Sequence, residues 1–221
     1  MAIRKNNFLL GDTTGSIDNV TLSKWRGLNI VKSRIGKRRK KTESKKVVLQ
    51  NEVFSIVQSF LNKFPKGFFN IGYRLPKNAK MTALNAATSY HMRNAVIGES
   101  PDLSIDYSQV KFTQSRRPIE NGWKATFTNA GNGEIVIKWE LNPFPEKSTH
   151  LDDQAVAVFY SEETKEFLIK GAKQRDSLVH NYLWEKELEG TQFYGWLFFV
   201  SADGKLVSGT QYLGKLKMMK S

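Results

Sequence analysis

The sequence contains no cysteine and no long hydrophobic run, and both absences limit what the protein can be. Without cysteine there are no disulfides, no thiolate metal ligands and no cysteine nucleophile. The apolar stretch YGWLFFV near the end is far shorter than the roughly 20 residues that a membrane helix needs. The opening stretch MAIRKNNFLLGDTTGS shows no signal-peptide pattern, because charged and amide residues interrupt it. We therefore expect a soluble cytoplasmic protein without membrane insertion.

Motifs that would carry catalysis are also missing. The three histidines lie in no HExxH or other metal-binding spacing, and neither a GxSxG nucleophile elbow nor a GxxxxGK[ST] phosphate loop is present. The carboxylate-rich stretches EETKE (162–166) and EKELE (185–189) fit the solvent side of strands and turns better than acid–base pairs. We therefore expect no enzyme, no cofactor and no metal, with a hydrolase using these carboxylates as the weakest alternative.

The histidines have plainer explanations than metal binding. His91 falls on a predicted helix, where we expect a packed or half-exposed side chain rather than a metal ligand. His150 lies beside Asp152 and Asp153, and we expect this trio to form a solvated loop.

Positive charge is in excess, and the excess is confined to one half of the chain. Residues 1–105 carry 19 Lys and Arg against 6 Asp and Glu, whereas residues 106–221 carry 15 of each, so the net charge of +13 belongs to the first half. The stretch KSRIGKRRKKTESKK (32–46) holds nine of the basic residues. They are Lys32, Arg34, Lys37, Arg38, Arg39, Lys40, Lys41, Lys45 and Lys46. Such asymmetry predicts that this half meets an anionic partner.

Three explanations of the basic segment 32–46 stay open. The segment could contact nucleic acid, without base specificity because no helix-turn-helix, zinc-finger or RNA-recognition motif accompanies it. Its binding would then weaken steeply with salt. It could instead dock on an acidic protein surface within an assembly, including a neighbouring copy of the chain. It could also be a solvated loop without a partner.

The first half alternates between strand and helix patterns. Residues 20–33 predict an antiparallel hairpin that turns near Gly27, after a glycine-containing loop. Apolar residues at helical spacing between 49 and 64 predict a helix that is capped by Thr42 or Ser44 and carries Lys45 and Lys46 on its first turn. A second helix is predicted over 81–97, closed by Gly98, and is followed by a linker over 98–108.

The segment between the two helices mixes aromatic and basic residues. In FPKGFFNIGYRLPKNAK (64–80), such mixing could stack and neutralise single-stranded nucleic acid. We favour the simpler interpretation, in which the aromatic side chains pack under the neighbouring helix and the lysines stay in solvent.

From Val110 onward the pattern is almost purely β. Seven short strands, separated by turns such as AGNG, EETK and ADGK, are spaced as in a β-sandwich. This segment resembles a fibronectin type III or immunoglobulin-like domain. The resemblance rests on Trp139 in IVIKWELNPFP, on the alternation of Tyr194, Trp196 and Phe198, and on SADGKLVS as a last hairpin.

The whole chain also resembles a family of uncharacterised Bacteroidota proteins that is known only as a domain of unknown function. The residues that carry this resemblance are Gly15, Asn19, Trp25-Arg26-Gly27 and Arg34, then KMTALNAATSYHMRNAVIGESPDLSIDYSQV (80–110) and FVSADGKLVSGTQYLG (199–214). The chain departs from the family at Lys40-Lys41-Thr42, where relatives tend to have Pro-Arg-Thr. The resemblance implies a two-part architecture and no catalytic residues.

These observations predict an α+β protein. Residues 1–105 would form a basic domain of a β-hairpin and two helices, and residues 106–221 a β-sandwich. We expect a non-enzymatic structural or assembly protein, such as a phage-like particle component, that self-associates or joins a multisubunit complex. Its basic half would contact nucleic acid or an acidic subunit, in the cytoplasm or in a virion. The alternative is a nonspecific nucleic-acid-binding protein whose sandwich docks a partner.

Overall fold

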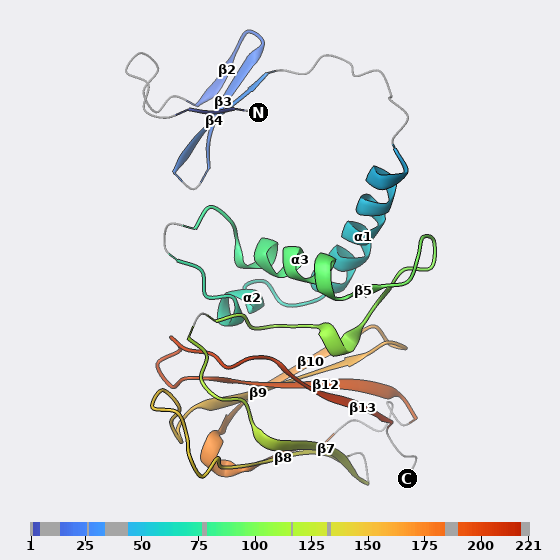
Figure 1. Cartoon of the computed structure of the whole chain (residues 1–221), viewed down its shortest axis with the longest axis vertical. Coiled ribbons are helices and arrows are strands. Elements are labelled where there is room, and N and C mark those ends of the chain that lie inside the picture. Colours follow the sequence, from blue (N-terminus) through green and yellow to red (C-terminus); the bar gives the residue numbers. More distant parts are fainter. Residues whose placement is uncertain are drawn as a thin grey trace. The chain divides into compact units, whose positions relative to one another are not determined.

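The structure, a computed structural model, describes residues 2–4, 14–25, 27–33, 44–76, 79–115, 117–131, 134–183 and 190–217. The chain has the predicted α+β composition, with strands at the N-terminus, helices in the middle and a β-sandwich at the C-terminus (Figure 1). Its contacts divide the chain into two compact units, residues 1–47 with 76–80, and residues 48–75 with 81–221. Each unit is described here by itself.

The first unit is a four-stranded antiparallel sheet in the order β1-β4-β3-β2. The predicted hairpin is confirmed, with Trp25 at the end of β3 opposite Leu28 at the start of β4. Gly27 between them has a φ of 74°, a left-handed conformation that glycine adopts without strain. The strands are β1 (Ala2–Arg4), β2 (Gly15–Ile17), β3 (Val20–Trp25) and β4 (Leu28–Ser33).

This sheet differs from the prediction at Gly15, which was expected in a loop. Gly15 starts β2 and pairs with Leu22 of β3, because the backbone of 15–17 completes the free edge of the hairpin. Leu22 is buried, but Ile17 and Trp25 keep 61% and 42% of their surface exposed. The described residues of this sheet therefore enclose little core of their own.

The helices are α1 (Lys45–Leu61), α2 (Phe68–Gly72) and α3 (Ala83–Asn94), and the second unit includes α1 from Val48 onward. Helix α1 starts directly after Ser44, one of the two predicted capping residues, so Lys45 and Lys46 occupy its first turn. Its apolar stripe is buried in the C-terminal half, whereas the N-terminal half exposes apolar side chains. The buried residues are Val57, Phe60 and Leu61, and the exposed ones are Val47, Val48, Leu49 and Phe54.

Helix α3 is shorter than predicted. The Thr82 hydroxyl caps its N-terminus by accepting a hydrogen bond from the Asn85 N–H at 3.1 Å. The helix ends at Asn94 rather than near Gly98, because the next residues pair as strand β5 (Val96–Ile97) with β6 (Ser104–Ile105). The predicted linker is thus a short hairpin followed by the 3-10 turn η1 (Tyr107–Gln109), and Gly98 lies in the hairpin loop with a φ of 93°.

The seven predicted sandwich strands are confirmed in two antiparallel sheets, ordered β10-β9-β12-β13 and β11-β8-β7. Tyr194, Trp196 and Phe198 lie on the penultimate strand, as expected from the resemblance. The strands are β7 (Trp123–Gly131), β8 (Glu134–Glu140), β9 (Gln154–Ser161), β10 (Phe167–Gln174), β11 (Val179–Leu183), β12 (Gln192–Val200) and β13 (Gln211–Lys217). The 3-10 turn η2 (Arg175–Ser177) joins β10 to β11.

The larger sheet is buried on both faces, so the second unit has three layers. The larger sheet lies between the smaller sheet and the helices (Figure 1). Side chains on one face of β9 and β12 pack against the smaller sheet, and those on the other face pack under the helices. The inner residues include Ala155, Ala157, Phe159, Leu197 and Phe199. The residues under the helices include Val158, Tyr160, Trp196 and Phe198. This double burial explains why YGWLFFV is continuously apolar rather than alternating.

The helices and the sandwich therefore share a core. The ring of Phe60 on α1 lies 5.5 Å from that of Tyr160, and the indole N–H of Trp196 donates to the Tyr107 carbonyl at 3.1 Å. The predicted boundary between residues 105 and 106 falls inside this unit.

Candidate functional site

The basic segment 32–46 is described only at its two ends. Lys32 lies on β4 opposite Thr21, and Lys45 and Lys46 lie at the start of α1. All three side chains are exposed. The other six predicted contact residues lie outside the described part of the chain: Arg34, Lys37, Arg38, Arg39, Lys40 and Lys41. The structure thus shows accessible lysines on both sides of the segment.

In the segment 64–80, the aromatic side chains are buried and the described basic side chains are exposed, which is the interpretation that we favoured from the sequence. Phe64, Phe68, Phe69 and Tyr73 are 3% to 7% exposed and belong to the core under the helices, whereas the basic side chains of Lys66, Arg74 and Lys80 are exposed. Buried rings offer no face on which a nucleic-acid base could stack. This segment is therefore not a stacking platform.

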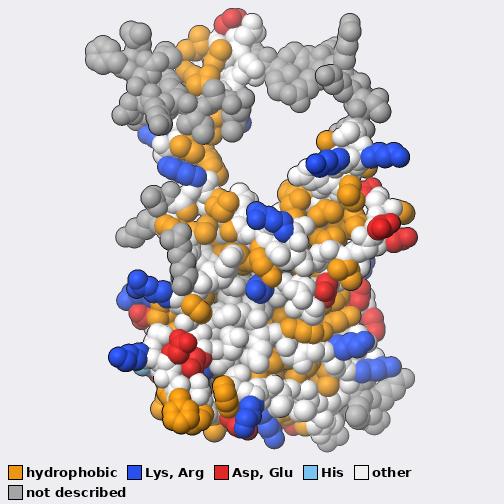
Figure 2. Space-filling model, viewed as in Figure 1, with side chains coloured by type: hydrophobic (Ala, Val, Ile, Leu, Met, Phe, Trp, Pro, Cys, Tyr) orange, Lys and Arg blue, Asp and Glu red, His pale blue; other side chains and the backbone are white. Residues whose placement is uncertain are grey.

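The described residues of the sandwich carry charge of both signs. On the face shown in Figure 2, its Lys and Arg side chains are interspersed with Asp and Glu. The described carboxylates of the EETKE stretch, Glu162, Glu163 and Glu166, are exposed as predicted, and EKELE lies outside the described residues. This distribution agrees with the zero net charge of residues 106–221.

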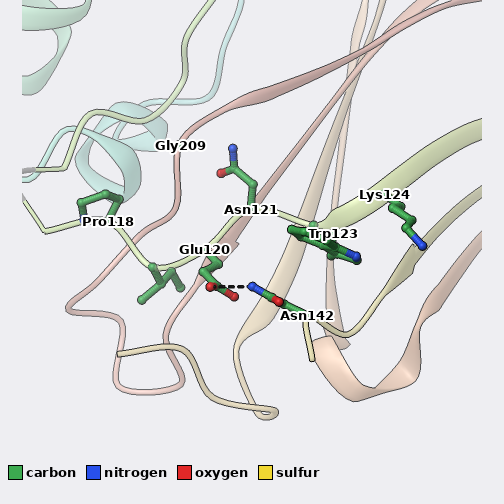
Figure 3. Close-up of a pocket in the computed structure, with 9 residues that line it drawn as sticks. Pro118, Glu120, Asn121, Trp123, Lys124, Asn142 and Gly209 are labelled. Atoms are coloured by element: carbon green, nitrogen blue, oxygen red, sulfur yellow. Dashed lines mark hydrogen bonds between the residues drawn. The ribbon is translucent and has the colours of Figure 1, made fainter. Parts of the chain in front are cut away.

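A pocket of about 430 Å³ lies at the end of the sandwich where β7 begins and β8 ends (Figure 3). Antiparallel pairing of Trp123 with Glu140 brings the residues before β7 next to those after β8. The pocket is lined by Pro118, Ile119, Glu120, Asn121, Gly122, Trp123, Lys124, Asn142 and Gly209. It combines one large aromatic side chain, 43% exposed, with several polar ones.

The polar wall of the pocket is held by hydrogen bonds. One carboxylate oxygen of Glu120, Oε1, accepts from the Asn142 amide at 2.9 Å (Figure 3) and from the Glu146 N–H at 3.1 Å. The Asn142 side-chain oxygen in turn accepts from the Phe144 N–H at 3.0 Å. These bonds fix Glu120, in the segment before β7, to the loop after β8, so the wall needs little reordering to meet a ligand.

A buried arginine supports the pocket from behind. Arg175 is 5% exposed, and its guanidinium donates to the backbone carbonyls of Glu120 and Asn121 at 2.7 and 3.3 Å. Its Nε lies 3.2 Å from the carboxylate of Asp153, which is fully buried. The prediction that Asp153 lies in a solvated loop is therefore wrong, because Arg175 and the His150 N–H draw this carboxylate inside.

The strand that carries Trp123 is irregular beside the pocket. Lys124 has a φ of 48°, a left-handed conformation that is uncommon for residues other than glycine. The register of β7 against β8 shifts between Trp123 and Thr126, which marks a β-bulge. Bulges redirect side chains and concentrate next to functional sites. Here the bulge leaves the Trp123 side chain in the pocket.

His91 is completely buried, so of the two expected environments, packed or half-exposed, the structure shows the packed one. Within the part of the chain that the structure describes, no group of three or more histidine and acidic side chains is placed to hold a metal ion. No helix among the described residues is long and apolar enough to cross a membrane.

The sequence did not point to the pocket, because its residues come from three separate stretches. Trp123 and Asn142 were part of predicted strands and loops, and Gly209 lies much farther along the chain. The local signals were the Asn-Pro that follows β8 and a tryptophan at the very start of a strand, neither of which is specific.

Solved structures similar to this chain include fibronectin type III domains. One is the domain of human collagen alpha-1(XX) chain, with 12% identity, 49% of this chain and 90% of that chain covered, and a TM-score of 0.34. Another is the domain of human contactin 1, with 15% identity, 57% and 93% covered, and a TM-score of 0.32. No curated protein matches the sequence.

A protein-family model, by contrast, matches almost the whole chain. It spans residues 12–214, from the N-terminal sheet through the helices to the last strand of the sandwich. The match includes both stretches on which the resemblance to a family of unknown function was based. The chain belongs to the family of unknown function DUF6266.

Proposed function

We propose that the protein is a non-enzymatic structural or assembly protein whose basic segment 32–46 contacts a polyanion, either nucleic acid or an acidic subunit. The observation that carries the proposal is the distribution of charge: residues 1–105 hold the entire net charge of +13. The exposure of Lys32, Lys45 and Lys46 at the described ends of the segment supports it. A surface charge excess of this kind attracts anionic partners over distances of about 8 Å at physiological salt.

The start of α1 favours an acidic protein subunit over nucleic acid. Next to Lys45 and Lys46, the helix exposes Val47, Val48 and Leu49, each by more than 40%. Basic and hydrophobic side chains are displayed together on these turns (Figure 2). Phosphate contacts need only the charge, whereas a protein interface also buries apolar side chains. The assembly would be a phage-like particle or another multisubunit complex, in a virion or in the cytoplasm.

The test compares the wild type with a variant in which Lys37, Arg38, Arg39, Lys40 and Lys41 are changed to Gln. Binding to duplex DNA and to single-stranded RNA is titrated at several salt concentrations, and light scattering gives the mass in the same buffers. A control variant changes five exposed lysines of the sandwich to Gln and so alters the net charge equally. These are Lys138, Lys147, Lys170, Lys173 and Lys215.

We expect an oligomer that the segment variant dissociates and the control variant leaves intact. If the wild type instead binds nucleic acid with a salt slope of about −0.9 per phosphate contact, and only the segment variant loses it, the protein is a nonspecific nucleic-acid-binding protein. If binding and mass are the same in all three proteins, the segment is a solvated loop and the proposal fails.

A further inference from the structure

We propose that the pocket beside Trp123 binds a sugar ring of a neutral glycan. The pocket lies wholly within the second unit, and none of its nine lining residues belongs to the basic segment 32–46. The arguments are the exposed indole, the hydrogen-bonding groups around it, the charge of the wall and the rigidity of the support.

The indole of Trp123 offers an apolar platform. It keeps 43% of its surface exposed, although tryptophan has more apolar area to bury than any other residue. A large aromatic side chain left open inside a pocket is typical of a binding site. The C–H face of a pyranose ring is flat and apolar, and its size suits a pocket of about 430 Å³.

The rim of the pocket offers hydrogen-bonding groups on Glu120 and Asn121, which suit a ligand that both donates and accepts hydrogen bonds. Glu120 uses Oε1 for two internal hydrogen bonds, and no group in the described part of the chain hydrogen-bonds to its Oε2. The Asn121 side chain is exposed and likewise has no hydrogen-bond partner among the described residues. A carboxylate oxygen only accepts, whereas an amide does both. A sugar hydroxyl both donates and accepts hydrogen bonds. Neighbouring hydroxyls on one ring therefore suit the Glu120 carboxylate and the Asn121 amide together.

The charge of the wall selects a neutral ligand. Glu120 contributes a carboxylate, which repels phosphate, sulfate and uronic acids. The nearby ammonium of Lys124 does not compensate for this charge, because it is paired with Glu140 at 2.8 Å. Anionic glycans are therefore expected to bind worse than neutral ones.

The support of the pocket is preorganised. Arg175 holds the carbonyls of Glu120 and Asn121, and the bulge at Lys124 fixes the direction of Trp123. Gly209 lies close to the Asn121 side chain, since a Cβ there would be 3.3 Å from its amide oxygen. A pocket held this way loses little conformational entropy when a ligand enters.

A proline-rich peptide is the main competing ligand, since such peptides dock on aromatic grooves. Those grooves are lined by several aromatic side chains, whereas Trp123 is the one aromatic residue among the nine that line this pocket. Proline also has no N–H to donate to Glu120. The lining therefore favours the sugar.

The experiment titrates the full chain, by calorimetry and by saturation-transfer NMR, with neutral oligosaccharides built from glucose, mannose, galactose, xylose and N-acetylglucosamine. A proline decamer is titrated in parallel. The variants are Trp123→Ala and Asn121→Ala. The matched control is Trp25→Ala, since Trp25 on β3 is exposed to nearly the same degree, 42% against 43%.

We expect at least one sugar series to bind, and Trp123→Ala to weaken its affinity by about tenfold or more. Asn121→Ala should weaken it severalfold, and Trp25→Ala should leave it unchanged. Asn121→Ala also serves as the deciding variant if Trp123→Ala does not fold, as judged by its thermal melting. The proposal is overturned if no sugar binds up to about 10 mM, if neither pocket variant changes the affinity, or if only the proline decamer binds.

Discussion

The guanidinium of Arg175 lies 3.2 Å from the carboxylate of Asp153, and both side chains are almost completely removed from solvent. Arg175 also lies over the ring of Phe199, 3.9 Å from its centroid, and its backbone carbonyl accepts from the indole of Trp139 at 2.7 Å. The pair thus connects three regions: the segment before β7, the loop before β9 and the turn η2. Two of the contacting side chains, Trp139 and Phe199, belong to the core between the two sheets of the sandwich.

Replacing Arg175 should destabilise the protein strongly. In Arg175→Met, the Asp153 carboxylate stays buried without its cation, and the carbonyls of Glu120 and Asn121 lose their donor. Removing one partner of a buried ion pair costs about 3–5 kcal/mol. Urea denaturation of the full chain measures the loss of unfolding free energy. Lys205→Met is the control, because its ion pair with Asp203 is solvent-exposed, and it should leave the curve unchanged. A loss below about 1 kcal/mol in Arg175→Met would show that the pair is not structural.

His91 should make the stability depend on pH. Its Nδ1–H donates to the Ala87 carbonyl at 2.7 Å, and its Nε2 accepts from the Lys111 N–H at 3.2 Å, so the fold requires the neutral ring. Burial lowers the pKa of His91 from 6.5 to about 4. Between these values the unfolded chain binds the proton and the folded chain does not. The unfolding free energy should therefore fall by about 3 kcal/mol as the pH drops from about 6.5 to about 4.

The His91 effect is separable from other titrations by substitution. His91→Gln removes the titrating ring, so the difference in unfolding free energy between wild type and variant should shrink as the pH falls. Parallel pH curves for the wild type and His91→Gln would contradict the prediction.

Gly72 should not tolerate a methyl group. A Cβ at this position would lie 1.9 Å from the backbone carbonyl oxygen of Phe112, a part of the chain that a side-chain rotation cannot move. The two segments are also joined by the Gln114 N–H, which donates to the Gly72 carbonyl at 3.0 Å. Gly72→Ala should lower the unfolding free energy by about 1–3 kcal/mol. Gly171→Ala on β10 is the matched control, because a Cβ there meets nothing within 4 Å, and its thermal melting should be unchanged or slightly higher.

Helices and strands with local sequence signals were predicted correctly. Features that depend on contacts between residues far apart in the sequence were not predicted. The sandwich strands were found because turn residues separate them, and the start of α1 because Ser44 precedes an apolar stripe. The end of α3 was misplaced because Val96 and Ile97 continue the apolar pattern of the helix, yet they pair with Ser104 and Ile105. The Arg175–Asp153 pair and the Trp123 pocket join residues that no spacing rule connects.

The predicted domain boundary between residues 105 and 106 falls inside the second compact unit. A change from helix to strand pattern near residue 105 suggested two separate domains, because secondary-structure patterns do not reveal which faces pack together. The aromatic contacts of Phe60 with Tyr160 and of Phe112 with Trp196, at 5.5 and 5.3 Å, join the two parts into one core.

The fragment 106–221 should consequently fail to fold as a stable monomer. Without the helices, the outer face of the larger sheet would expose Val158, Tyr160, Trp196 and Phe198, all of which are at most 4% exposed in the whole chain. Burying one such side chain stabilises a fold by about 1.5–3 kcal/mol, so losing four removes most of the stability of an ordinary domain. The fragment 48–221 keeps the helices and is the control; it should unfold cooperatively and stay monomeric.

Circular dichroism, dye binding to exposed apolar surface and light scattering distinguish the two fragments. We expect 106–221 to bind the dye or aggregate, and 48–221 to melt in one transition. If 106–221 melts cooperatively as a monomer, then the inner core of the smaller and larger sheets is sufficient by itself, and the helices are an addition to an independent sandwich. In that case the boundary near residue 105 stands, and the contacts of Phe60 and Phe112 describe docking between domains rather than a shared core.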